Sequence, residues 1–181
     1  MKKKLVIIMR GIPGSGKSTW AKNYPTPCFI VSTDKFFIDE KDGEYKFDIE
    51  KLGYNHQKAF YQFQGAVNNE VPVIIIDNTN IKRKNYKNYV EFGLSGGYTV
   101  VQKVCCGNYQ SVHNVPEEKI EQMRHEFQVD ETLPHYEENI KTITLNEARE
   151  HALHVFEETE KRLQEERLRE SNFIISLSTG M

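Results

Sequence analysis

Residues 5–18 read Leu5-Val-Ile-Ile-Met-Arg-Gly-Ile-Pro-Gly-Ser-Gly-Lys-Ser18, and this stretch decides the fold. Its first half is a continuous apolar run, which is typical of a strand covered on both faces. Its second half, from Gly11 to Ser18, matches the P-loop pattern Gly-x-x-x-x-Gly-Lys-Ser. A helix is expected from Ser18 to Tyr24, because no proline or glycine interrupts those residues. The P-loop pattern requires this order of strand, loop and helix.

The glycine-rich loop predicts a binding site for the phosphates of a nucleoside triphosphate. Glycines leave the backbone amides open, so that the loop and the start of the helix point N–H groups at the phosphates. The Lys17 side chain adds a positive charge at the β and γ phosphates, and the Ser18 hydroxyl is a magnesium ligand in such loops. The expected phosphate-binding residues are Gly11, Pro13, Gly14, Ser15, Gly16, Lys17, Ser18 and Thr19. A dinucleotide-binding loop is the weaker reading, since Thr19 stands where that fingerprint needs a third glycine.

Strand and helix patterns alternate along the rest of the chain. Further strands are expected at 28–31, 71–76, 98–104 and 140–145, and further helices from Asp48, over 82–94, from Pro116 and over 146–171. Several of these strands are apolar throughout, which favours a parallel sheet with helices on both faces. The fold class is therefore α/β, a P-loop NTPase three-layer sandwich with a mostly parallel sheet of about five strands and a long C-terminal helix.

Length and composition indicate one globular domain over residues 1–181, with a core of about 1–145 and a helical extension at about 146–171. The three cysteines show no metal-binding or disulfide spacing, which favours a reducing cytoplasm. No apolar run reaches the roughly 18 residues that a membrane span needs, so no membrane partner is expected. The apolar side of the C-terminal helix would pack either on the body of the domain or on a second copy of the chain. The second alternative would give a homo-oligomer.

Two aspartates follow predicted strands at the edge where ligands bind in open α/β sheets. Asp34 lies three residues beyond Val31, and a carboxylate there could accept the proton of an attacking hydroxyl. Asp77 closes the apolar run that ends at Ile76, the position of a carboxylate that holds magnesium or its water. The alternative for either residue is that it only forms a turn.

Other polar residues have readings that the sequence leaves open. Thr79 and Asn80 could orient a substrate or only shape the loop after their strand. His56 recurs with apolar neighbours on the helix after Asp48, which favours a core or cleft-lining histidine. The run 82–89 interleaves basic residues with tyrosines; a solvated helix face is the better interpretation, and contact with a nucleic-acid backbone is the alternative.

These motifs resemble the polynucleotide-kinase-like P-loop kinases, a family that includes the kinase domain of bacteriophage polynucleotide kinase and related AAA-like kinases. The resemblance covers about residues 4–130. It rests on the P-loop with its following Thr-Trp-Ala, on Ser32-Thr33-Asp34, on Asp77-x-Thr79-Asn80, on Gly97-Tyr98-x-Val100 and on Val115-Pro116 before a helix. By resemblance, Asp34 is the general base that takes the proton of an acceptor hydroxyl, and Asp77 is an active-site carboxylate.

The chain departs from the family at two places that matter for catalysis. The phage enzyme has an arginine three residues beyond its base, and here that position is Phe37. The family's lid carries arginines that stabilise the transferring phosphoryl group, whereas residues 105–116 contain neither Arg nor Lys. An arginine in that role contributes roughly 10³ to 10⁵ in rate. Arg124, Lys103 or an arginine of a partner chain are the candidates to replace it.

The sequence thus predicts an ATP-dependent kinase that uses Mg²⁺ and transfers the γ-phosphoryl group to a hydroxyl. A polynucleotide 5′-hydroxyl end is the first acceptor implied by the resemblance, and a nucleoside or other small-molecule alcohol is the alternative. The expected catalytic residues are Lys17, Asp34, Asp77 and Arg124, and the expected metal ligands are Ser18 and Asp77. The competing hypothesis is an ATP-binding regulatory module without kinase turnover, which the cation-free lid favours.

Overall fold

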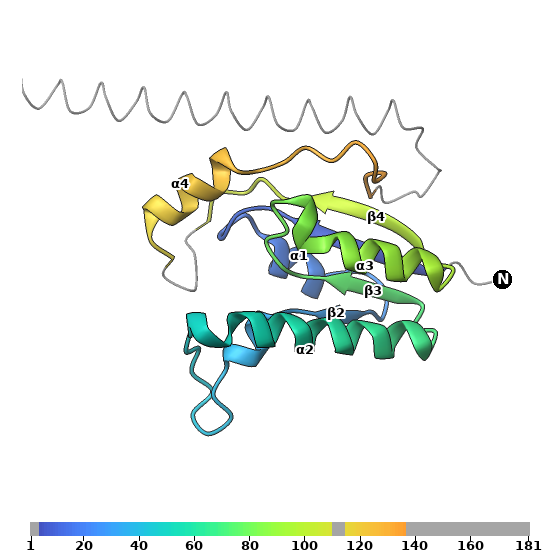
Figure 1. Cartoon of the computed structure of the whole chain (residues 1–181), viewed down its shortest axis with the longest axis horizontal. Helices are drawn as coiled ribbons and strands as arrows, with labels where there is room; N and C mark the ends of the chain where they lie inside the picture. Colours follow the sequence, from blue (N-terminus) through green and yellow to red (C-terminus); the bar gives the residue numbers. More distant parts are fainter. Residues whose placement is uncertain (1–3, 110–114, 137–181) are drawn as a thin grey trace, which may run out of the picture.

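The computed structural model describes residues 4–109 and 115–136, and these form a parallel sheet between helices (Figure 1). Strand β1 (Leu5–Arg10) lies inside the sheet, whose order is β2-β3-β1-β4. It pairs in parallel with β3 (Val73–Ile76) on one side and with β4 (Thr99–Val104) on the other, while β2 (Phe29–Val31) forms the edge beyond β3. Every side chain of β1 is buried, as its apolar sequence predicts for a strand covered on both faces.

The helices follow these strands along the chain, and two of them begin at a side-chain cap or after a proline. Helix α1 (Lys17–Lys22) follows the P-loop, and a short 3-10 helix, η1 (Asp34–Phe37), follows β2. Helix α2 (Ile49–Asn68) starts at Asp48, whose carboxylate accepts a hydrogen bond from the Glu50 amide, as expected for an N-cap. Helix α3 (Arg83–Ser95) connects β3 to β4, and α4 (Glu117–His125) begins after Pro116.

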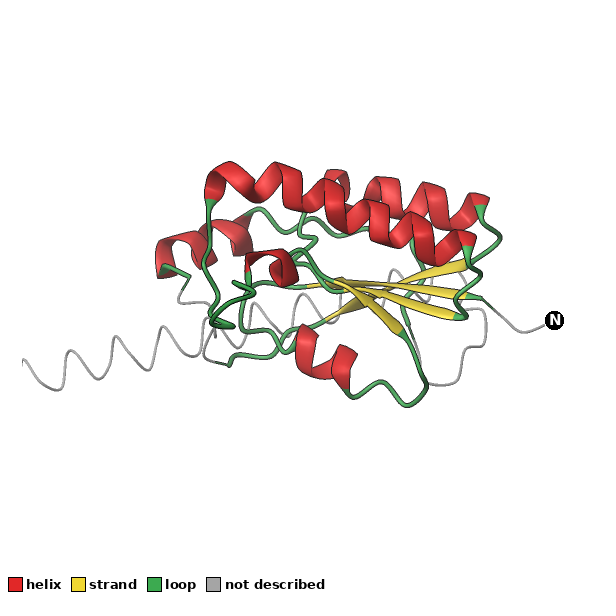
Figure 2. Ribbon diagram, turned by 90° about the horizontal axis from the view of Figure 1, so that it is seen from below, coloured by secondary structure: helices red, strands yellow, loops and turns green. Residues whose placement is uncertain are grey.

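Helices cover both faces of the sheet (Figure 2), and an apolar cluster on each face holds the layers together. On one face, α2 and α3 cover Val6 and Ile8 with an aromatic cluster in which Phe63 is fully buried. On the other face, α1 covers Ile7 and Met9, and Trp20 packs edge-on against the ring of Tyr136 with centroids 5.1 Å apart. Helices on both faces of a parallel sheet confirm the predicted α/β class.

Arg10, the last residue of β1, is a buried cation that organises the carboxyl edge of the sheet. Its guanidinium donates to the carbonyl oxygens of Asn80, Ile81 and Gln128 and to the side-chain oxygen of Gln102. The guanidinium carbon also lies over two aromatic rings, 4.9 Å from the centroid of Tyr86 and 4.7 Å from that of Phe127. These contacts fix the loop after β3 and the segment after α4 to the end of the central strand.

The expected elements within the described residues are all present, with ends shifted by one or two residues. The described part of the sheet has four strands. The expected fifth strand at 140–145, the long helix at 146–171 and the contact between copies through that helix lie outside the described residues. The boundaries of the single domain stay a prediction. No helix in the described ranges combines the length and apolar character that crossing a bilayer requires.

Candidate active site

The P-loop connects β1 to α1, and its glycines adopt conformations that side chains would disturb. Gly11 has φ +148°, and a Cβ there would lie 2.5 Å from the carbonyl oxygen of Cys105. Gly16 has φ +89°, in the left-handed region that favours glycine. The amide of Gly11 donates to the carbonyl oxygen of Thr79 at 2.9 Å, so the loop after β3 supports the P-loop directly.

The predicted phosphate-binding residues differ in their exposure to solvent, and the pattern indicates a loop that is anchored in the core and accessible where α1 begins. The side chains of Ser15 and Lys17 are buried, as is Gly11. Pro13, Gly14 and Gly16 are half-buried, and Ser18 and Thr19 are exposed at the start of α1. The loop can therefore receive a ligand at the residues where the pattern places phosphates and magnesium.

The Lys17 side chain folds back over the P-loop. Its Nζ donates to the carbonyl oxygen of Ile12 at 2.8 Å and to the Ser15 hydroxyl at 3.3 Å. Burial lowers the pKa of Lys17, and the attraction of Asp77, Cys105 and Asp34 opposes that shift in part. A buried ammonium held mainly by neutral oxygens is a ready partner for a polyanion.

Asp77 follows β3 and has an unsatisfied oxygen beside the P-loop. Its Oδ1 is buried and has no hydrogen-bond partner in the described part of the chain. Burial raises the pKa of Asp77, while a hydrogen bond with Ser18 and the charge of Lys17 lower it. Mg²⁺ prefers carboxylate and hydroxyl oxygens and usually keeps several waters. The orphaned Oδ1 next to the exposed Ser18 hydroxyl fits such an ion, and these two residues would hold it.

Asp34 lies at the start of η1, just beyond the end of β2, and its side chain is exposed. The Tyr45 hydroxyl donates to Asp34 Oδ1 at 3.4 Å. Burial and the neighbouring charge of Asp34 together raise the pKa of Tyr45 to about 12, so Tyr45 stays a neutral donor at pH 7. The charge of Asp34 also acts on the pKa values of Lys17 and Asp77, which places the three groups in one electrostatic neighbourhood.

Asn78 and His56 position the residue before Asp34, a function that the sequence did not reveal for either. The Asn78 side-chain oxygen accepts from the Thr33 amide at 2.9 Å, and His56 Nδ1 lies 3.1 Å from the Thr33 hydroxyl. His56 is exposed rather than part of the core, and burial of its ring lowers its pKa against the attraction of Asp34. The sequence does not reveal this role of Asn78, because an Asn that follows a strand is typical of an ordinary turn.

Of the two interpretations that the sequence left open for Asn80, the structure supports the one in which it shapes the loop. It is buried, has φ +46°, and its side-chain amide donates to the carbonyl oxygen of Met9 at 2.8 Å. It therefore shapes the loop behind the P-loop. Asn tolerates the left-handed conformation better than most residues, because its short side chain can bond to nearby backbone.

The contacts of Arg124, Lys103 and Phe37 show what each side chain does in the described part of the chain. The Arg124 side chain pairs with Glu121 on its own helix at 3.5 Å, and its buried Nε has no partner within the described ranges. Lys103 Nζ lies 5.5 Å from the centre of the Trp20 ring. Phe37 is buried against Tyr45 and Phe47. No contact between described residues joins Arg124 to Lys17 or the two aspartates, so its catalytic role stays a prediction.

Three comparisons relate the chain to known proteins. NEDD4-binding protein 2 of Homo sapiens is 29% identical over 137 residues, a match that covers 68% of this chain and 8% of that protein. A chain of the Pnkp1/Rnl/Hen1 complex gives a TM-score of 0.49 at 19% identity, with 79% of this chain and 49% of that chain covered. The APS kinase CysC of Mycobacterium tuberculosis gives 0.42 at 10% identity, with 70% and 98% covered.

A family model described as an AAA domain matches residues 6–129. The match includes the P-loop, both aspartates and β4, and it agrees with the AAA-like resemblance that the sequence motifs indicate. The chain spans a small part of NEDD4-binding protein 2 and about half of the matched chain from the Pnkp1/Rnl/Hen1 complex. Since the family model covers well over half of the sequence, the chain belongs to the AAA domain family.

Proposed function

We propose that the chain is an ATP-dependent kinase that transfers the γ-phosphoryl group to a hydroxyl, with a polynucleotide 5′ end as the acceptor. One observation carries this proposal: beside the P-loop, at the carboxyl edge of the sheet, the charge of Asp34 acts on the pKa values of both Lys17 and Asp77. A phosphate-binding ammonium, a metal-binding carboxylate and an exposed carboxylate are the groups that phosphoryl transfer to an alcohol requires.

Each residue has a defined task in this mechanism. The loop amides and the Lys17 ammonium hold the phosphates, and Ser18 and Asp77 would hold Mg²⁺, which supplies positive charge at the phosphate oxygens when it is bound. Asp34 accepts the proton of the acceptor hydroxyl, and the Tyr45 hydroxyl donates a hydrogen bond to its carboxylate. Catalysis rests mainly on positioning and on electrostatic stabilisation, because this reaction needs little covalent chemistry from the protein.

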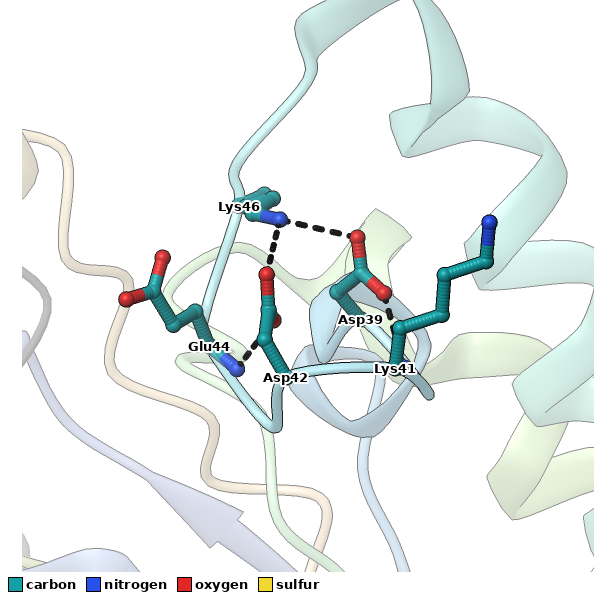
Figure 3. A network of polar contacts seen from close by, with 5 residues as sticks. All are labelled: Asp39, Lys41, Asp42, Glu44 and Lys46. Atoms are coloured by element: carbon teal, nitrogen blue, oxygen red, sulfur yellow. Dashed lines mark hydrogen bonds and ion pairs between the residues drawn. The ribbon is translucent and has the colours of Figure 1, made fainter.

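A small-molecule alcohol is a second candidate acceptor, and the charge beside Asp34 favours it. Residues 38–50 hold six acidic side chains and two lysines. Lys46 is bound by two of the carboxylates, those of Asp39 and Asp42, at 2.8 and 2.6 Å (Figure 3). An acidic rim repels a polyanion and is neutral toward an uncharged alcohol, so this rim argues against a long nucleic-acid contact on that side.

A regulatory ATP-binding module is the remaining alternative, and the absence of Arg and Lys from 105–116 favours it. A screen with γ-labelled ATP and magnesium separates the three functions. The acceptors are oligonucleotides with free 5′-hydroxyls, nucleosides and sugars. Label in an oligonucleotide supports the first acceptor, label only in a small alcohol supports the second, and tight ATP binding without any labelled acceptor contradicts the kinase proposal.

Replacing Asp34 by Asn tests the proposed base directly. We expect the dissociation constant for Mg-ATP to stay within about twofold, while the transfer rate falls at least 10²-fold, the lower range for loss of a general base. Asp39→Asn is the matched control, because Asp39 is a nearby carboxylate bound to Lys46 and has no part in the proposed chemistry. Transfer that survives in Asp34→Asn would show that another group takes the proton.

A further inference from the structure

Tyr109 is an exposed aromatic residue fixed to the P-loop by its backbone. It lies five residues beyond the end of β4, and 68% of its surface is exposed. Its amide donates to the carbonyl oxygen of Gly14 at 2.9 Å. Two residues earlier, the amide of Gly107 donates to the carbonyl oxygen of Ser15 at 3.1 Å. The segment 105–109 therefore runs along the P-loop with two main-chain hydrogen bonds that hold it there.

The Tyr109 ring occupies space that two glycines leave open. A Cβ on Gly16 would lie 3.1 Å from Tyr109 Cε2, and a Cβ on Gly107 would lie 2.3 Å from the same atom. Gly16 is the residue directly before Lys17, so the edge of the ring touches the loop at the point where phosphates are expected. A side chain at either glycine would push the ring away.

Burial does not account for this arrangement. Most of the residue is exposed to solvent, so the hydrophobic effect gives little reason to hold it in one place. The aromatic residues that stabilise the fold, such as Phe63 and Tyr86, are buried in the sheet–helix layers instead. An exposed aromatic residue whose backbone is anchored beside the P-loop can offer its ring to a planar group, because stacking needs a π-face and little loss of conformational freedom.

We propose that the Tyr109 ring is the platform on which the base of the bound nucleotide stacks. This inference rests on the proposed nucleotide binding at the P-loop and names a residue for the base. In a nucleotide, one sugar separates the base from the first phosphate, so a base-binding group must lie close to the phosphate loop. Tyr109 meets that condition by its contact with Gly16. Base–aromatic stacking is tolerant of base identity, since every base has a π-face.

Inorganic tripolyphosphate, which has phosphates and no base, separates this role from any effect on the phosphate site. Calorimetry would compare Mg-ATP and Mg-tripolyphosphate on the full chain, on Tyr109→Ala, on Tyr109→Phe and on Lys17→Ala. We expect Tyr109→Ala to weaken ATP about 5- to 150-fold and to leave tripolyphosphate unchanged. Tyr109→Phe keeps the ring and should keep ATP affinity, while Lys17→Ala should weaken both ligands.

Three results would overturn the assignment. Equal loss of both ligands in Tyr109→Ala means that the residue shapes the phosphate site, and unchanged ATP affinity means that the ring is an ordinary surface residue. Tighter binding of both ligands means that the ring covers the loop. If the unaltered chain binds neither ligand, the proposed function itself fails. Melting temperatures of the variants show whether each is folded, and the exposure of Tyr109 predicts that the two Tyr109 variants are.

Discussion

At the residue scale, the site holds two opposite charges that the fold does not fully satisfy. Burial lowers the pKa of Lys17 and raises that of Asp77, so each group is pushed toward its neutral form. Their mutual attraction opposes both shifts without removing them. Perturbed groups of this kind gather at functional sites, where a ligand supplies the missing partner. Here the phosphates would pair with the Lys17 ammonium, and a metal ion would bind the Asp77 carboxylate.

Asp77→Asn should therefore improve stability and damage function. It removes a buried carboxylate whose ionised form the fold disfavours, and we expect the melting temperature without ligand to rise by roughly 2–4 °C, the shift that about 1 kcal/mol produces at this size. The magnesium dependence of nucleotide binding should disappear, as shown by titrations with and without the ion. A lower melting temperature would mean that the bond with Ser18 and the charge of Lys17 outweigh burial.

At the element scale, Arg10 joins three segments that are distant in sequence. It ends β1, bonds to the loop after β3 through Asn80 and Ile81, and reaches the segment after α4 at Gln128. The same β3 loop accepts the Gly11 amide through Thr79. The position of the P-loop thus depends on one guanidinium that takes no part in the proposed chemistry.

Arg10→Met tests this dependence. The substitution keeps the volume of an aliphatic stem but leaves buried carbonyl oxygens without donors, and each such loss costs about 1–3 kcal/mol. We expect urea denaturation to show that the free energy of unfolding falls by about 2–5 kcal/mol. In hydrogen exchange, the loop after β3 should lose more amide protection than the rest of the sheet. Arg10→Lys keeps the charge but loses the planar guanidinium. Its free energy of unfolding should therefore lie between those of the unaltered chain and of Arg10→Met. Unchanged stability would show that water can replace the guanidinium.

The elements themselves were largely readable from the sequence, and their long-range bonds were not. Apolar runs predicted the strands, and Asp48 and Pro116 predicted helix starts, because these signals are local. The P-loop motif likewise predicted its own backbone shape. No local pattern assigned a role to Arg10, to Asn78 or to Tyr109. Their roles depend on partners up to 118 residues away in the sequence, which no local pattern encodes.

At the scale of the whole molecule, the site is assembled from the carboxyl ends of all four described strands. β1 leads into the P-loop, β2 into Asp34, β3 into Asp77, and β4 into the segment that runs along the loop. Global unfolding must separate these strands and so destroys the site. The binding free energy of a nucleotide therefore adds to the stability of the entire sheet and not to one loop.

A thermal-shift experiment measures that coupling. With Mg-ATP at 100 times its dissociation constant, we expect about 2.7 kcal/mol of added stability, which raises the melting temperature by roughly 5–10 °C. Lys17→Ala should remove most of the shift at the same ATP concentration, because its affinity is lower. A full shift in that variant would mean that ATP binds elsewhere on the chain.

The position of Trp20 makes its intrinsic fluorescence a probe of the phosphate-binding loop. It is the single tryptophan of the sequence, it lies on the first turns of α1 three residues beyond Lys17, and it touches Tyr136 from the far end of the described chain. Indole emission will thus respond to events at the phosphate loop without any attached dye. Rapid-mixing traces of that emission would give the nucleotide association and release rates, which set the upper limit on turnover.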